Sequence, residues 1–377
     1  MSTPSTHTTS DGGTAVLDAA TVPTAALRDV GSDDVALVGG KGANLGEMLG
    51  TGFPVPDGFV VTAAAFVDVV AANACREELA EFTRAAAVAS PGELEEIAAA
   101  ARALVRECEV PDDLVAEVTS RYAEHCGGRR VAVRSSATAE DTAETSFAGM
   151  NESFTNVGAD ELIDRIVDCW VSLYGDRVVA YRAERGLTDE PQIAVVVQSM
   201  VDSDRSGVMF TADPSDRDRL VIEAAFGLGE VVVSGAVEPD TYRVDRETAS
   251  VRELRIGHKD ARIVSTDRGD RHETLDEAHA WRRVLSDDEI ARVASVGLDI
   301  ERHYGSPQDI EWSYEGEELF IVQSRPITTL DDVEPGDDEP ILRGLGVGAR
   351  SASGPVRVLD SPKDGRRLVD GEVLVAT

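Results

Sequence analysis

The chain has 377 residues, 42% of them hydrophobic, and a formal net charge of −34 at pH 7. This length suits two or three domains, and no apolar run approaches the roughly 20 residues that a membrane helix needs. The strong negative charge repels polyanions, which argues against nucleic acid and anionic membranes as partners.

The positive charge comes almost entirely from arginine, because the only lysines are Lys41, Lys259 and Lys363. An acidic, lysine-poor composition is typical of proteins from salt-loving microbes, in which high ionic strength screens the repulsion between like charges. We therefore expect a halophilic source. This composition carries no information about the chemistry of the protein.

We expect residues 1–20 to be a disordered tail, because the Ser/Thr-rich start lacks the basic and apolar regions of a secretory signal. The cysteines are widely spaced and include no CxxC pair, which favours buried, reduced thiols over a zinc site. They are Cys75, Cys108, Cys126 and Cys169. A cytoplasmic location follows as an expectation.

The first part of the chain, to about residue 127, has a mainly helical pattern. Ser90 and Glu93 form a capping box with Pro91 in the first turn, which predicts a helix that runs through Val105. The elements predicted next are a short strand at Val131–Arg134 and helices at about Ala159–Tyr174 and Asp176–Glu184. We assign residues 21–191 to an N-terminal lobe.

A β-rich lobe is predicted to begin near Gln192 and to extend to residue 329. Its expected strands are Ile193–Met200, Gly207–Thr211, Leu220–Ala224, Thr241–Val244 and Val251–Ile256. Ser286 and Glu289 cap a later helix, and two more strands are expected at Gln308–Tyr314 and Leu319–Gln323. The predicted fold class is therefore α+β.

The acidic stretch 330–340 contains Pro and Gly and predicts an exposed linker. Residues 341–377 are rich in glycine and short strands, yet some 37 residues are too few for a packed domain. We expect this part to be the beginning of a truncated module.

Lys41 stands between glycines in "LVGGKGANLGEML", just before a predicted helix. Glycines allow close backbone approach, a helix N-terminus favours anions, and an ammonium group adds a point charge. These features suit a phosphate site, although the P-loop pattern GxxxxGK[ST] is absent. The alternative is a glycine turn that caps the helix, with a solvated lysine.

Arg134 follows the apolar Val131–Val133, so the strand is expected to present its guanidinium group at the strand end, where it can bind phosphate bidentately. The alternative is that Arg134 pairs with one of the acids that follow it. We expect those acids, which are Glu140, Asp141 and Glu144, to face solvent or a basic partner.

The stretch "DIEWSYEGEELFIVQSRP" predicts a metal site. Alternate residues of a strand share a face, so Asp309 and Glu311 point one way, and Gln323 and Arg325 share a face on the next strand. If the strands pair as a hairpin, the oxygens of Glu311 and Gln323 can reach one Mg²⁺, with Arg325 beside it. The alternative is a half-exposed hairpin with a polar face.

Two weaker signals lie in the β-rich part. Gln198–Val201, "QSMV", could bind an adenine edge through backbone groups, with Met200 packed on the ring. Glu223–Glu230, "EAAFGLGE", is a strand and a glycine-rich turn that is more often structural. No histidine has a nucleophile-like setting, and His272 and His279 favour a solvated helix face.

Taken together, the motifs "GGKGANLGEM", "VRSSATAED", "SFAGM", "SGVMFTADP", "EAAFGLGE", "DIEW" and "QSRPIT" resemble the nucleotide-binding domain of phosphoenolpyruvate synthases, over about residues 21–329. The resemblance implies a two-lobed ATP-grasp fold with MgATP between the lobes. The residues that it implies at the phosphates are Lys41, Arg134 and Arg325, and those at Mg²⁺ are Glu311, Gln323 and Asp309. Those that it implies around the rest of the nucleotide are Gln198, Met200, Val201 and Glu223, with a closing loop that contains Thr145, Ser146 and Gly149.

In the family, ATP phosphorylates a histidine on a swivelling domain that delivers the phosphoryl group to pyruvate. The products are phosphoenolpyruvate, AMP and phosphate. Residues 341–377 resemble the start of that domain, but the Thr-Ser-His motif and the pyruvate domain are absent. The expectation is a fragment, or a chain that works as a homodimer or with a complementing chain. Rifampicin phosphotransferase, pyruvate phosphate dikinase and a non-catalytic ATP-binding remnant are the alternatives.

Overall fold

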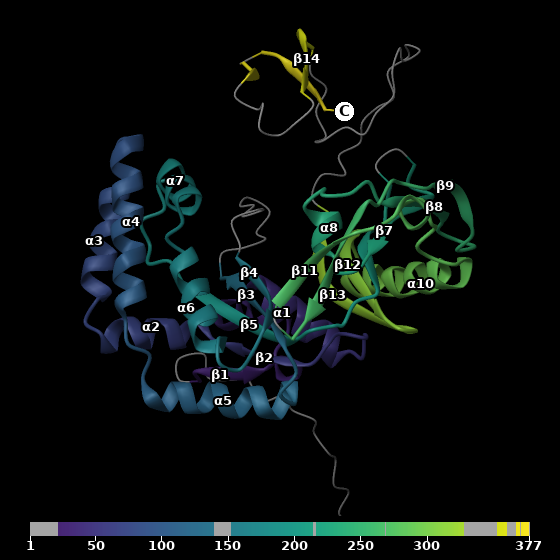
Figure 1. Cartoon of the computed structure of the whole chain (residues 1–377). Coiled ribbons are helices and arrows are strands. Elements are labelled where there is room, and N and C mark those ends of the chain that lie inside the picture. Colours follow the sequence, from purple (N-terminus) through teal and green to yellow (C-terminus); the bar gives the residue numbers. More distant parts are fainter. Residues whose placement is uncertain are drawn as a thin grey trace, which may run out of the picture. The chain divides into compact units, whose positions relative to one another are not determined.

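The computed structural model describes residues 22–138, 152–213, 216–267, 269–327, 353–359, 367–369 and 371–376. The chain forms two compact units, Met1–Pro326 and Ile327–Thr377. Helices and several sheets occur together, as Figure 1 shows, which confirms the α+β class. In the described ranges, none of the helices has the length and apolar character needed to cross a bilayer.

The first unit contains a five-stranded antiparallel sheet in the order β1-β2-β5-β3-β4. Its strands are β1 (Thr24–Ala26), β2 (Gly58–Val61), β3 (Val131–Ala137), β4 (Ser153–Val157) and β5 (Ile193–Ser199). The inner strand β5 is buried along almost its whole length, as its Ile/Val-rich sequence predicts.

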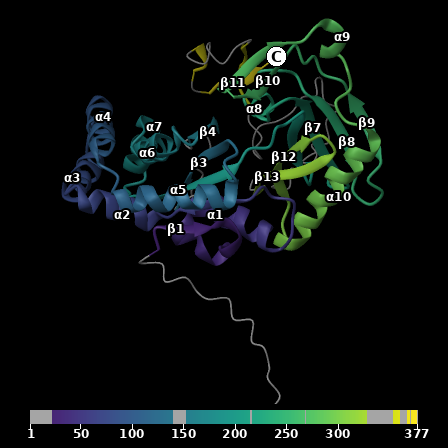
Figure 2. The same cartoon turned by 60° about the horizontal axis from the view of Figure 1, so that its bottom comes forward.

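Seven helices accompany this sheet among the described residues. They are α1 (Val35–Gly50), α2 (Ala63–Ala72), α3 (Arg76–Ala86), α4 (Pro91–Glu107), α5 (Asp112–Cys126), α6 (Leu162–Ser172) and α7 (Asp176–Glu184). The capping box predicted for α4 is present, since Glu93 accepts hydrogen bonds from the backbone and hydroxyl of Ser90. Helices α3 and α4 lie at the end of the unit that is remote from the second sheet (Figure 2).

The second sheet of the first unit has six antiparallel strands in the order β13-β12-β6-β7-β8-β9. They are β6 (Arg205–Phe210), β7 (Arg219–Phe226), β8 (Asp240–Asp245), β9 (Val251–Arg255), β12 (Gln308–Glu315) and β13 (Glu318–Pro326). The short helices α8 (Glu230–Val233) and α9 (Glu277–Ala280) and a hairpin of β10 (Ala261–Thr266) and β11 (Gly269–Thr274) accompany it.

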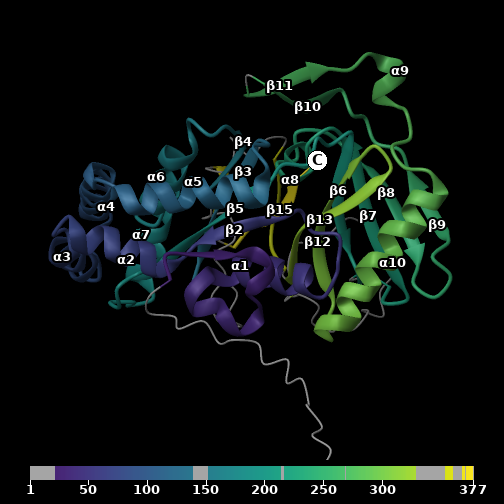
Figure 3. The same ribbon diagram turned by 90° about the horizontal axis from the view of Figure 1, so that it is seen from below.

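Helix α10 (Asp287–Tyr304) lies across one face of the second sheet (Figure 3). It begins with the predicted capping box of Ser286 and Glu289, and its buried Ile290, Val293 and Ile300 contribute to the core. That core also contains residues of α1, β2 and β5. One apolar core therefore joins the two sheets.

Strand β5 differs from the sequence prediction. We predicted that the β-rich lobe starts near Gln192, but Ile193–Ser199 pairs with β2 and β3 in the first sheet, and the second sheet begins only at Arg205. The reason is that a strand buried on both faces has no alternation to indicate its sheet, and its partners lie 56 or more residues away in sequence.

Two smaller predictions also need correction. His272 lies in strand β11 and only His279 lies in a helix, so the two do not share a helix face. Strands β1, β2, β4, β10 and β11 were not predicted; β1 and β2 are only three and four residues long.

In the second unit, β14 (Val356–Leu359) and β15 (Val373–Ala376) pair in parallel. The predicted linker at residues 330–340 lies outside the described residues.

Candidate functional site

A cavity of about 590 Å³ lies between the two sheets of the first unit. It brings together eight of the predicted site residues, from both sheets and from α1: Lys41, Arg134, Gln198, Met200, Val201, Glu311, Gln323 and Arg325. Residues that are as much as 284 positions apart in sequence therefore surround one space.

Lys41 reaches this cavity because helix α1 is interrupted just before it. Gly39 has a non-helical backbone with φ 70°, and a Cβ atom there would lie 2.3 Å from the carbonyl oxygen of Ser136. The close approach lets Nζ of Lys41 donate to the carbonyl oxygen of Ser135 at 3.1 Å. The kink divides α1 into two segments, and the helix start predicted near Lys41 is the start of the second one. The lysine is therefore directed at β3 and the cavity.

Arg134 connects the two sheets. It lies within β3 and not at a strand end, because the strand continues to Ala137. Its guanidinium group donates to the backbone oxygen of Val322 and to Oε1 of Gln323, both at 2.7 Å, and lies 3.7 Å from a carboxylate oxygen of Glu311. Among the described residues its partners are therefore on the opposite sheet.

The predicted hairpin of β12 and β13 is confirmed, with Glu311 opposite Gln323 and Asp309 opposite Arg325. Directly opposed residues of an antiparallel pair share a face, so Glu311 and Gln323 present a carboxylate and an amide side by side. Ile310 and Trp312 point into the core, as the alternation predicts. No cluster of three or more His, Cys, Asp or Glu with metal-site geometry occurs in the described part of the chain.

Asp309 has a partner that was not predicted. Its carboxylate accepts from Nε of Arg325 at 2.9 Å and forms an ion pair with the same guanidinium group. Asp309 is not among the residues that line the cavity, whereas Arg325 is. In this structure Asp309 is therefore a partner of Arg325.

The opposite wall contains the QSMV segment. The buried side chain of Gln198 donates to the backbone oxygen of Pro56 at 3.1 Å, and the backbone N–H of Met200 donates to Arg130. Within the described residues, the backbone N–H of Val201 has no hydrogen-bond acceptor. The segment therefore lines the cavity with a polar backbone group that a ligand can bind.

Glu223 does not line the cavity. It follows Gln323, Glu311 and Val208 in the same row across the second sheet. Burial raises the pKa of the Glu223 carboxyl above its usual value, while the charge of Arg255 acts in the opposite direction.

Several lining residues were not predicted. Asn44 donates to the backbone of Ser324, and the glycine-rich turn after β7 contributes Leu228, Gly229 and Glu230. The motif "GLGE" contained the signal for the turn, but its turn residues are also common in purely structural loops.

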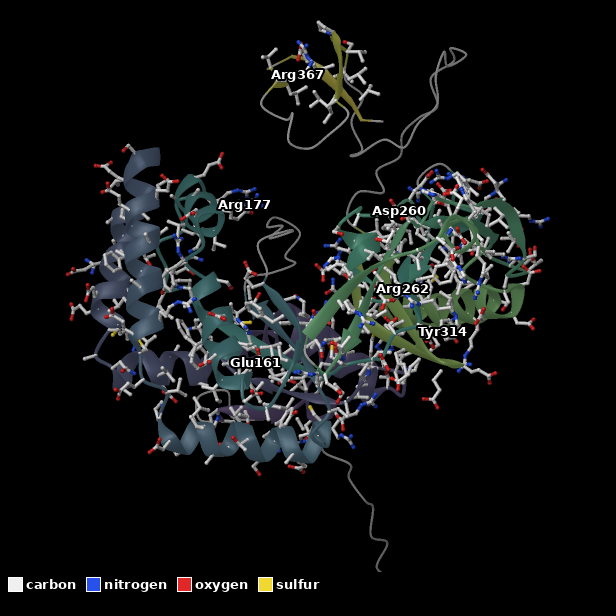
Figure 4. The ribbon with its side chains drawn as sticks, viewed as in Figure 1. Glu161, Arg177, Asp260, Arg262, Tyr314 and Arg367 are labelled. Carbon is white, nitrogen blue, oxygen red and sulfur yellow. The ribbon has the colours of Figure 1, made fainter. Side chains whose placement is uncertain are left out.

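The β10–β11 hairpin contacts both walls of the cavity. On one side, Ile263 accepts from the backbone of Leu228 at 2.9 Å. On the other, Thr266 accepts from the side chain of Asn156 in β4 at 2.9 Å, and Thr155 donates to Asp270. Arg262 of this hairpin, labelled in Figure 4, pairs with Glu273 on the adjacent strand.

The predicted closing loop with Thr145, Ser146 and Gly149 lies outside the described residues, as do Glu140, Asp141 and Glu144.

The sequence matches the model of one protein family, described as the pyruvate phosphate dikinase AMP/ATP-binding domain, over residues 35–341. The chain belongs to this family. The matched range contains every residue of the cavity wall, so the cavity lies within the part of the chain that matches this AMP/ATP-binding domain.

Curated relatives confirm the resemblance seen in the motifs. A probable phosphoenolpyruvate synthase of Archaeoglobus fulgidus is 42% identical over 372 residues, which cover 94% of this chain and 49% of the relative. The phosphoenolpyruvate synthase of Pyrococcus furiosus is 39% identical over 408 residues, covering 93% and 50%. The rifampicin phosphotransferase of a Streptomyces species is 39% identical over 327 residues, covering 85% and 38%.

The chain therefore spans about half the length of the phosphoenolpyruvate synthases that it matches. The relatives named here are phosphoenolpyruvate synthases and a rifampicin phosphotransferase, and the part of this chain that matches the family model is an AMP/ATP-binding domain.

Proposed function

We propose that the first unit is the MgATP-binding domain of a phosphoenolpyruvate synthase, with an ATP-grasp arrangement in which the nucleotide lies between the two sheets. The observation that carries the proposal is the cluster of Arg134, Gln323 and Glu311, which joins opposite walls of the cavity. Cations and oxygen ligands on facing walls are what a metal-bound polyphosphate requires.

Lys41, Arg134 and Arg325 would bind the phosphates. Lys41 supplies a point charge at the start of a helical segment, and the planar fork of Arg134 can bind two phosphate oxygens at once. Arg325 is kept in place by Asp309, at 2.9 Å. Together these cations would hold the terminal phosphates in line for transfer and offset their charge.

The oxygens of Glu311 and Gln323 fit Mg²⁺, which prefers hard oxygen ligands and retains several waters. Two adjacent oxygen ligands in an open cavity meet that requirement, with Asp309 two residues from Glu311 on the same strand. When bound, Mg²⁺ would offset the charge on the phosphates. Adenine would lie against Gln198, Met200 and Val201. Glu223, which is in the same row of the second sheet as Glu311 but does not line the cavity, would influence the site only from a distance.

The complete reaction would convert ATP, pyruvate and water to phosphoenolpyruvate, AMP and phosphate. We place the acceptor histidine and the pyruvate site outside these 377 residues, because the sequence contains no Thr-Ser-His motif. Residues 341–377 would be the start of the swivelling domain, and the reaction would take place in the cytoplasm, where ATP is available. The synthase is favoured over rifampicin phosphotransferase because it covers more of the chain.

Calorimetric titration with MgATP tests the site. Lys41→Met and Arg134→Met should each weaken binding roughly ten- to a hundredfold, since a hydrogen bond to a charged group contributes about 1.5 to 3 kcal/mol. Arg177→Met is a matched control, because Arg177 is exposed on α7 and lies outside the cavity wall (Figure 4). Unchanged affinity in both site variants would refute the assignment.

The metal assignment needs a separate titration, with ATP at varied Mg²⁺ concentration. Glu311→Ala should remove the Mg²⁺ dependence of ATP binding while circular dichroism shows an intact fold. If parent and variant respond equally to Mg²⁺, Glu311 is not a ligand. The measurements are best made in dilute buffer and in molar potassium chloride, because salt screens the charge of −34.

A further inference from the structure

Helix α8 contributes a carboxylate to the cavity that the roles above do not use. Glu230 lines the cavity and is exposed, and among the described residues the only other carboxylate of the lining is Glu311. Within the described residues, the carboxylate of Glu230 forms no ion pair and accepts no hydrogen bond. By contrast, Glu311 lies 3.7 Å from Arg134.

The position of α8 relates Glu230 to the end of the cavity at which adenine is placed. Met200 of the QSMV segment packs against an apolar cluster that includes Leu228, Val231 and Val232, so this segment and α8 border the same apolar cluster. Lys41, Arg134 and Arg325 are all engaged with other groups. An anion that pairs with none of these cations belongs beside the neutral part of a nucleotide, because a carboxylate among the phosphates would repel them.

The chemistry of ATP then restricts what Glu230 can bind. An ionised carboxylate is only an acceptor and can accept two hydrogen bonds at once. The triphosphate has no donor at neutral pH, so the donors of ATP are the two ribose hydroxyl groups and the amino group of adenine. A vicinal diol matches the two oxygens of a carboxylate, and acidic side chains read ribose hydroxyls in this way in other nucleotide sites.

We propose that Glu230 binds the ribose hydroxyl groups of the nucleotide and selects ribonucleotides over deoxyribonucleotides. This inference rests on the proposed function. It assigns Glu230 to specificity, separate from the cations that hold the phosphates and from the groups that hold Mg²⁺.

The test combines a variant with altered ligands. The affinities of ATP, 2′-deoxy-ATP and 2′,3′-dideoxy-ATP are measured by calorimetry for the parent protein and for Glu230→Ala. The substitution should weaken ATP about tenfold, the size expected for a hydrogen bond to a charged acceptor. It should weaken 2′-deoxy-ATP less than it weakens ATP, because one of the two hydroxyl partners is already absent from that ligand. It should change the affinity for 2′,3′-dideoxy-ATP, which lacks both hydroxyls, less than about twofold.

Glu247→Ala is the matched control, since Glu247 is also an exposed glutamate of the second lobe but lies outside the cavity wall. Equal losses for ATP and 2′-deoxy-ATP, or no loss, would overturn the assignment. A loss that disappears with purine riboside triphosphate, which lacks the amino group, would also overturn it, because Glu230 would then face the base. Failure of the parent protein to bind ATP at all would instead refute the proposed function.

Discussion

Two clusters of charged side chains in the first unit have opposite character. Asp240 and Lys259 form an ion pair in which both side chains are 0% exposed. Arg134 and Glu311 face the cavity, with 12% and 26% of their side chains exposed. One cluster is closed to solvent and the other opens onto a space of about 590 Å³.

The closed cluster obtains all of its partners from the chain. The Asp240 carboxylate accepts from the backbone of Gly257 at 3.1 Å, from that of Val284 at 2.8 Å and from the hydroxyl of Tyr242 at 3.0 Å, besides Lys259. Lys259 also donates to the carbonyl of Gly257 at 2.7 Å. A buried charge is tolerated only when it is satisfied in this way.

The charged groups of the open cluster can bind a ligand. Arg134 has two acceptors on the facing sheet, and a polyphosphate can replace them without leaving them buried, because the cavity admits water. The comparison teaches that the number of partners supplied by the chain separates a structural charge cluster from a binding one. Lys259 and Arg134 fall on opposite sides of that division.

Lys259→Met should produce the largest loss of stability. It leaves the Asp240 carboxylate buried with one strong partner fewer, and breaking a buried pair costs about 3 to 5 kcal/mol. Chemical denaturation followed by circular dichroism measures the loss. Arg134→Met is the comparison variant, and its free energy of unfolding should change by less than about 1 kcal/mol because water can reach the groups it leaves. Equal losses of stability in the two variants would show that the number of partners supplied by the chain does not separate structural charges from binding charges.

Ser90→Ala tests how much burial contributes. In the capping box of α4 the chain supplies the hydrogen-bond partners, as in the closed cluster, but the groups are exposed. The hydroxyl and backbone N–H of Ser90 both donate to Glu93, and loss of an N-cap costs about 1 kcal/mol. We expect a loss of that size in the free energy of unfolding, with ATP affinity unchanged. Gly92→Ala, in the first turn with open space around its Cα, is the control. If Ser90→Ala lowered the free energy of unfolding as much as Lys259→Met, burial would not increase the cost of losing a partner.

Glu223→Gln should have the smallest effect and the opposite sign. Burial raises the pKa of the folded-state carboxyl above 4.5, so the folded protein binds the extra proton between pH 4.5 and that raised pKa. The free energy of unfolding therefore decreases as pH rises through this window. The variant should be more stable than the parent at pH 7, by no more than about 1 kcal/mol for this partly exposed group. Thermal unfolding of the parent and the variant without nucleotide, from pH 4 to pH 8, measures this difference. The same pH dependence of stability in both proteins would contradict the prediction.

Local signals accounted for much of the site. The alternation in β12 and β13 predicted the register that places Glu311 beside Gln323, and the capping boxes predicted where α4 and α10 begin. These features depend on residues close in sequence, whose spacing directly determines geometry.

Long-range contacts were harder to predict. The pairing of Arg134 with Gln323 spans 189 positions, and only the fold brings Glu230 and Met200 to the same cavity. The sequence did not predict that Asp309 binds Arg325, because alternation gives the face of a residue but not which neighbour it contacts. Glu223 lies in the same row of the second sheet as Glu311 but does not line the cavity.

The inner position of β5 has a consequence for the order in which the protein can form. In the sequence order of synthesis, β1, β2, β3 and β4 all precede β5, yet β5 is the strand that joins the β1–β2 pair to the β3–β4 pair. Until Ser199 has left the ribosome, the first sheet exists only as two separate hairpin-like pairs with unsatisfied edges. A fragment that ends at Gln192 would expose those same edges permanently and would be expected to aggregate.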